Sequence, residues 1–168
     1  MKRNEQMDAF SEQLVKKTED SSDGIKRIGI IAAGSVLFLA LIYVTFIYTP
    51  FAIIAAAGVI FGTYYLLQNT FIEYEYIISN EYFDIDKIIA QKRRKNLLSI
   101  TVKDITDFTD ETDKPFDGVT YIAAGGDEPL KCAYFNSSNI GKARVLFSPN
   151  EKTLKNIYIN LDRRIKRI

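Results

Sequence analysis

Residues 28–67 read IGIIAAGSVLFLALIYVTFIYTPFAIIAAAGVIFGTYYLL, and this stretch decides the architecture of the chain. It contains no Lys, Arg, Asp or Glu, and Tyr48-Thr49-Pro50 interrupts it near the middle. A helix needs about 20 apolar residues to cross the ~30 Å hydrocarbon core of a bilayer, so the stretch is long enough to cross twice. Pro50 suits the first position of a second helix, with Thr49 as its N-cap. The sequence therefore predicts a transmembrane helical hairpin with spans over about residues 28–47 and 51–67.

Charged residues flank this hairpin on one side only. Lys16, Lys17, Lys26 and Arg27 precede the first span, Lys87 and residues 92–95 follow the second, and the turn carries no charge. Because cytoplasmic flanks are rich in Lys and Arg, we expect a multi-pass protein of the cell membrane with both termini in the cytoplasm. Neither span holds an ionisable residue, which argues against an ion path or proton relay.

Two other interpretations of the stretch fit less well. A signal peptide has an apolar region of only about 7 to 15 residues and a short basic leader, unlike the mixed leader here. A buried soluble hairpin needs a larger domain to cover it than the remaining chain provides. Within the hairpin, Gly58 and Gly62 form a small-xxx-small pair, and we expect them to let the two helices pack closely, opposite Ala40 and Val36.

Composition restricts the chemistry. The 168 residues include 22 basic and 21 acidic side chains, interspersed along the chain, so no general nucleic-acid surface is indicated. There is no histidine and one cysteine, Cys132, which excludes an internal disulfide and the ordinary zinc, haem and Cys/His sites. Cys132 alternates with Leu130 and Tyr134, which predicts a core position. We expect a non-enzymatic protein without catalytic residues, metal or cofactor.

Residues 1–24 form a leader and linker. Met7, Phe10 and Leu14 recur at helical spacing and predict a short amphipathic helix. Three placements stay open: on the membrane surface, docked onto the C-terminal domain, or frayed. Residues 18–24, TEDSSDG, have the composition of a linker, and residues 25–70 complete the hairpin segment.

Residues 71–168 predict a small α+β domain. Alternating apolar and polar residues indicate six or seven antiparallel strands. These cover 71–79, 82–89, 97–102 with a continuation through 105–108, 119–124, 130–135 and 143–147. We expect 91–96 to be a basic connection, and 119–124 to form a hairpin with 130–135. A capping box from Ser148 to Glu151 then begins an amphipathic helix that continues to Ile168.

This order of elements resembles a pleckstrin-homology-like (PH-like) barrel, in which one C-terminal helix closes a curved sheet. The segment YEYIISNEYFDIDKIIAQKRRKNLLSITVKDITDF, Tyr74 to Phe108, is similar to the opening half of bacterial membrane-associated PH-like domains. With its leader and two spans, the chain resembles a bacterial family of uncharacterised two-span membrane proteins classed as a domain of unknown function. The resemblance implies a binding or assembly role and brings no catalytic residues.

Two charged segments are candidate sites. Lys92, Arg93, Arg94 and Lys95 are either a contact for anionic lipid, as in the basic hairpin of eukaryotic PH domains, or a solvated hairpin that protects a strand edge. An acidic loop, with Asp107, Asp110, Glu111, Asp113 and Asp117, lacks the spacing of a helix-loop-helix calcium site, and we expect an ordinary acidic turn. The basic residues Arg163, Arg164, Lys166 and Arg167 are expected on a solvated helix face.

We therefore expect a two-helix anchor that presents a PH-like module to the cytoplasm. The module would bind a protein partner or self-associate, with strand addition at an exposed sheet edge as one mode and the lipid bilayer as a second contact. The alternative is an accessory subunit of a transport or envelope complex that is recognised through the transmembrane hairpin itself.

Overall fold

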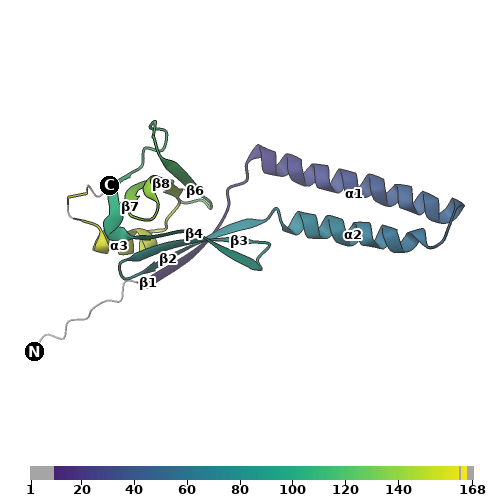
Figure 1. The fold of residues 1–168 in the computed structure, drawn as a ribbon, viewed down its shortest axis with the longest axis horizontal. Helices are drawn as coiled ribbons and strands as arrows, with labels where there is room; N and C mark the ends of the chain where they lie inside the picture. Colours follow the sequence, from purple (N-terminus) through teal and green to yellow (C-terminus); the bar gives the residue numbers. More distant parts are fainter. Residues whose placement is uncertain (1–9, 163, 166–168) are drawn as a thin grey trace, which may run out of the picture. The chain divides into compact units, whose positions relative to one another are not determined.

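The computed structural model describes residues 10–162 and 164–165 (Figure 1). The chain divides into two compact units. A helical unit contains residues 19–72 together with 89–92. Of the described residues, the domain unit contains 10–18, 73–88, 93–162 and 164–165.

The helical unit is an antiparallel pair, α1 (Ser21–Ile47) and α2 (Ala52–Gln68). α1 begins at Ser21, before the predicted span, because the Asp20 side chain caps it by accepting a 2.7 Å hydrogen bond from the Ser21 N–H. None of the 27 residues of α1 is buried, and this helix is long and apolar enough to cross a membrane. α2 is a shorter apolar helix of 17 residues.

The two helices approach each other closely at Gly34. A Cβ atom built on Gly34 would lie 2.9 Å from Cγ2 of Thr63, so a larger residue at this position requires the Thr63 side chain to move. Cβ atoms built on Gly58 or Gly62 meet no atom within 4 Å. The close helix packing expected at Gly58 and Gly62 therefore stays a prediction.

The domain unit contains two four-stranded sheets. The first has the order β1-β2-β3-β4, with β1 (Phe10–Lys16), β2 (Ile72–Ser79), β3 (Tyr82–Ile89) and β4 (Arg93–Thr101). A 3-10 turn, η1 (Val102–Asp104), leads into the second sheet, whose order is β5-β7-β8-β6. Its strands are β5 (Ile105–Thr109), β6 (Val119–Ala123), β7 (Lys131–Ser137) and β8 (Gly141–Phe147), and α3 (Glu151–Asn160) follows. The sheets do not close into the predicted barrel.

The predicted leader helix is wrong, because residues 10–16 form strand β1. This strand pairs antiparallel with β2, from Phe10 opposite Ser79 to Lys16 opposite Glu73. Val15 and Ser11 are buried, whereas Phe10 and Leu14 of the expected apolar stripe are exposed. A helix this short is marginal in water, and the free edge of β2 offers a complete ladder instead. The helical hairpin is therefore the connection between two neighbouring strands of one sheet.

The predicted hairpin between residues 119–124 and 130–135 is also wrong. β7 pairs with β5 on one side and with β8 on the other, so β6 has no place beside it. β6 instead pairs in parallel with β8, from Val119 opposite Ala143 to Ala123 opposite Phe147. Two segments that are close in sequence can suggest a hairpin, but tertiary pairing of β7 with β5 excludes it here.

The C-terminal helix is shorter than predicted. Its N-cap is Asn150, whose side chain accepts a 2.8 Å hydrogen bond from the Thr153 N–H, and it ends at Asn160. Ser148, the expected cap, instead receives a 3.4 Å hydrogen bond from the Gly125 N–H. The remainder of the predicted helix includes residues 163 and 166–168, which lie outside the described residues.

The two sheets bury an aromatic core. The ring of Phe147 lies 5.2 Å from that of Phe83, 5.6 Å from that of Tyr76 and 6.1 Å from that of Phe108, between centroids. These edge-on and tilted contacts are favourable for aromatic pairs. Cys132 is fully buried, as predicted, but it lies opposite Thr109 and Leu146 and thus on the other face of the second sheet from Phe108 and Phe147.

Candidate functional site

Arg27 connects the two ends of the helical hairpin. Its Nε donates a 3.0 Å hydrogen bond to Oγ1 of Thr70, just beyond α2, and its Nη1 lies 2.5 Å from Oε1 of Glu19, just before α1. The guanidinium carbon lies 4.4 Å from the centroid of the Phe71 ring. A planar guanidinium can make all three contacts at once, which an ammonium group cannot. Arg27, Glu19, Thr70 and Phe71 therefore form the base of the hairpin.

The turn between β3 and β4 belongs to the same unit. The Ala90 N–H donates a 2.9 Å hydrogen bond to the Phe71 carbonyl, and the Lys92 N–H closes the turn on the Ile89 carbonyl at 3.2 Å. Ala90 and Gln91 have φ angles of 56° and 55°, the left-handed conformation that a type I′ hairpin turn requires. Neither residue is Gly or Asn, so the turn holds strain at the base of the hairpin.

The predicted basic cluster is divided between the two units. Lys92 is exposed in the turn of the helical unit, whereas Arg93, Arg94 and Lys95 begin strand β4 and are not the predicted connection. Nη2 of Arg94 lies 2.6 Å from Oε2 of Glu75, and its Nε lies 3.8 Å from Oδ2 of Asp86. Arg94 is therefore ion-paired with acidic groups on its own sheet, and contact of the four cations with anionic lipid stays a prediction.

Glu75 is a buried carboxyl on β2. Burial raises its pKa, and a hydrogen bond with the Glu12 side chain on β1 raises it further, whereas Arg94 acts in the opposite direction. Across residues 10–162 and 164–165, no group of three His, Cys, Asp or Glu side chains is arranged to hold a metal ion.

Comparison with known proteins decides the family. A family model described as "Bacterial PH-like domain (DUF6106)" matches residues 7–167. The chain belongs to this family. The match begins before β1 and ends beyond α3, so the helical hairpin lies inside the region that the family model covers. No curated protein matches the chain, and neither does any solved structure.

β6 is the edge of this PH-like domain best suited to a partner strand. The four edge strands that the structure describes are β1, β4, β5 and β6. Only β6, with the sequence VTYIA, has no charged residue. Val119 and Ile122 are 49% and 60% exposed. Since charges on an edge strand normally discourage pairing with another chain, an uncharged exposed edge favours strand addition.

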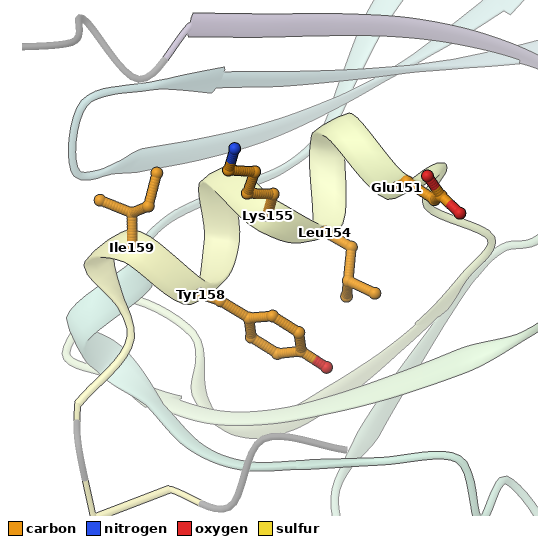
Figure 2. A pocket seen from close by; sticks show the side chains of 5 residues that line it. All are labelled: Glu151, Leu154, Lys155, Tyr158 and Ile159. Carbon is orange, nitrogen blue, oxygen red and sulfur yellow. The ribbon is translucent and has the colours of Figure 1, made fainter.

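Two hollows on the PH-like domain are less informative. One, of about 370 Å³, follows the outer side of α3 and is lined by Glu151, Leu154, Lys155, Tyr158 and Ile159 (Figure 2). Its single acidic and single basic side chain give no preference for a charged ligand. The other, of about 410 Å³, is lined in part by Phe116. The centroid of the Phe116 ring lies 5.5 Å from Nζ of Lys142 and 5.2 Å from Cζ of Arg144. Nη1 of Arg144 donates hydrogen bonds to the carbonyl oxygens of Thr112 and Lys114 in the neighbouring loop.

The remaining predicted segments form local ion pairs. In the acidic loop, Asp110 lies 2.5 Å from Lys131, and Glu111 lies 2.6 Å from Lys114. Of the C-terminal basic residues, Arg164 is exposed, and the other three lie outside the described residues.

Sequence reasoning missed the base of the hairpin and the β6 edge. In the sequence, Arg27 is one of several cations that flank the first span, and Phe71 is the first residue of a predicted strand. Neither pattern indicates that the two side chains meet. The absence of charge in β6 is visible in the sequence, but its position at a sheet edge depends on the pairing of three other strands.

Proposed function

We propose that this protein is an integral membrane protein in which α1 and α2 both cross the bilayer and the PH-like domain is a non-catalytic binding or assembly module at the cytoplasmic face. The observation that carries the proposal is the insertion of the helical hairpin between the paired strands β1 and β2. The domain is thereby attached to the hairpin twice.

Both attachments are short. Residues 17–20 separate β1 from α1, and residues 69–71 separate α2 from β2. At no more than about 3.6 Å per residue, neither connection extends beyond roughly 15 Å. A domain held by two such connections stays close to the membrane surface and cannot reach far into the cytoplasm. Its partners must therefore lie at the membrane as well.

The lengths of the helices support two crossings. The uncharged part of α1, from Ile28 to Ile47, extends about 30 Å, which equals the hydrocarbon core. α2 extends about 26 Å, and a mismatch of a few ångströms is accommodated by thinning of the bilayer or by tilt. Arg27 lies immediately outside the first span, where its contacts with Glu19, Thr70 and Phe71 can remain hydrated.

Cysteine labelling tests this topology. In a Cys132→Ser background, single cysteines are placed at Tyr48, in the turn, and at Lys95, on β4. We expect a membrane-impermeant maleimide to label Tyr48→Cys in intact cells and to label Lys95→Cys only after the cells are opened. Carbonate washing should leave both variants in the membrane. Release by carbonate, or labelling of Lys95→Cys in intact cells, contradicts the proposal.

We further propose that the module binds its protein partner, or a second copy, by strand addition at β6. A photoreactive residue at Ile122 should capture that partner in native membranes, and one at Lys155 on α3 is the matched control on the same domain. Equal capture from both positions, or capture from Lys155 alone, contradicts β6 as the binding edge.

The alternative function, an accessory subunit recognised through its hairpin, is favoured by one observation. Among the residues that the structure describes, none has an atom within 4 Å of a Cβ built on Gly58 or Gly62 of α2. Small residues on a membrane helix permit close approach of another helix. Capture of a protein from these two positions, and none from Ile122, supports this alternative over the module.

A further inference from the structure

A groove runs along one face of the helical hairpin, and its two ends differ in chemistry. It encloses about 650 Å³ between α1 and α2, within the size range of small-ligand pockets. Lys26 and Thr70 line the end near the base of the hairpin, and Leu37 and Val59 line the far end. The walls between are apolar. We propose that this groove binds an anionic phospholipid of the cytoplasmic leaflet, with its phosphate at Lys26 and one acyl chain along the groove.

Small residues create the groove. Gly29 and Ala33 on α1 and Gly62 on α2 line it without long side chains. Cβ atoms built on Gly29 and Gly62 meet nothing within 4 Å, so the space beside them is open. Gly34 and Thr63, where the two helices approach closely, also line the groove. The hollow is therefore part of the packed hairpin and not a gap between loose helices.

The length of the groove identifies the occupant. From Lys26 to Leu37 the helix rises about 17 Å, at 1.5 Å per residue. This distance is roughly half of the ~30 Å hydrocarbon core, which is the depth of one leaflet. An acyl chain of the cytoplasmic leaflet therefore ends where this groove ends.

The polar end supplies the charge that a lipid headgroup needs. The Lys26 side chain is 68% exposed, and its ion pair with Asp23 is long, at 3.8 Å. An ammonium group is a compact charge that binds phosphate, and a cation near an anionic leaflet gains further attraction. Arg27 is not available for this role, because Glu19, Thr70 and Phe71 occupy its guanidinium. Lys26 is thus the cation that would determine preference for an anionic headgroup.

The inference rests on the proposed two-span topology, and its test uses the full chain in phosphatidylcholine nanodiscs. Spin-labelled phosphatidylglycerol reports the fraction of lipid whose motion is restricted by the protein. Gly62→Leu fills the groove, and Gly58→Leu is its matched control, since both glycines are open on the same helix and only Gly62 lines the groove. We expect Gly62→Leu to remove most of the restricted component and Gly58→Leu to leave it unchanged.

Lys26→Gln tests the headgroup contact separately. It should lower the preference for phosphatidylglycerol over spin-labelled phosphatidylcholine about fivefold, while Lys155→Gln on α3 leaves it unchanged. Equal restriction in Gly62→Leu and Gly58→Leu, or an unchanged preference in Lys26→Gln, overturns the proposal. So does disulfide formation between two copies of a Gly62→Cys variant in a Cys132→Ser background, since a second copy would then occupy the groove.

The topology is checked on the same variants. If carbonate releases the wild-type chain from membranes, the proposed membrane function fails and the lipid site fails with it. If the chain stays in the membrane and Gly62→Leu behaves like Gly58→Leu, the lipid site alone is wrong.

Discussion

The pairing of β1 with β2 predicts that the helical hairpin can be removed without unfolding the PH-like domain. Lys16 lies opposite Glu73 at the end of the ladder, so Lys17 and Ile72 are the next two positions in the same register. A two-residue turn between them can therefore replace residues 18–71. Asn-Gly is the preferred sequence for such a turn, since both positions need positive φ angles. We expect the shortened chain to be a soluble, folded domain. A second chain that starts at Ile72 lacks β1 and should be much less stable.

The structure gives the size of this difference. Val15 of β1 is only 5% exposed, and burying a valine side chain contributes about 1.5–3 kcal/mol. The Gln13 side chain donates to the Ser148 carbonyl at 3.1 Å and accepts from the Asn150 N–H at 2.8 Å. Each of these hydrogen bonds contributes about 0.5–1.5 kcal/mol. Loss of β1 should therefore cost about 3–6 kcal/mol, a large part of the ~5–15 kcal/mol that stabilises a typical domain.

Thermal unfolding followed by circular dichroism measures the effect. A cost of this size corresponds to a lower melting temperature by at least about 12 °C for a domain of this length. Gln13→Ala in the Asn-Gly chain is the intermediate case and should lose only the part that the two hydrogen bonds contribute. If the chain that starts at Ile72 melts within about 4 °C of the Asn-Gly chain, β1 is not part of the domain and the reasoning is refuted.

Three further predictions concern single features. Tyr76→Phe removes the hydroxyl that donates to one backbone carbonyl and accepts from the Ser148 N–H at 3.2 Å, and should lower the free energy of unfolding of the Asn-Gly chain by about 1–3 kcal/mol in urea. Burial raises the pKa of Glu75 above its usual 4.5, so the folded state holds a proton that the unfolded state releases, and the free energy of unfolding falls as the pH rises through the raised pKa. Glu75→Gln should remove this fall and give no gain in stability below about pH 4. An unchanged pH profile of stability would contradict this reasoning. Changing Ala90-Gln91 to Asn-Gly relieves two positive φ angles and should raise the free energy of unfolding by about 1–2 kcal/mol, whereas a decrease would show that the turn is not strained.

Several elements could be predicted from local sequence because their cause is local. The uncharged stretch from Ile28 to Leu67 predicts apolar helices, since each helix satisfies its backbone within itself. Strands β2 and β3 follow from alternation of apolar and polar residues, although Glu73 and Glu75 on the polar face of β2 are also buried. The absence of histidine and the buried position of Cys132 needed no tertiary information either.

Other features depend on which segments meet, and no local pattern records this. Residues 10–16 satisfy a helical spacing, but the free edge of β2 makes them a strand. β6 and β7 are neighbours in sequence, yet β5 and β8 occupy both sides of β7. The candidate site has the same origin, because Arg27, Phe71 and the turn at Ala90 come from three separate segments. Periodicity is a property of one segment, whereas hydrogen-bond pairing between strands is a property of two, so only the tertiary structure could decide it.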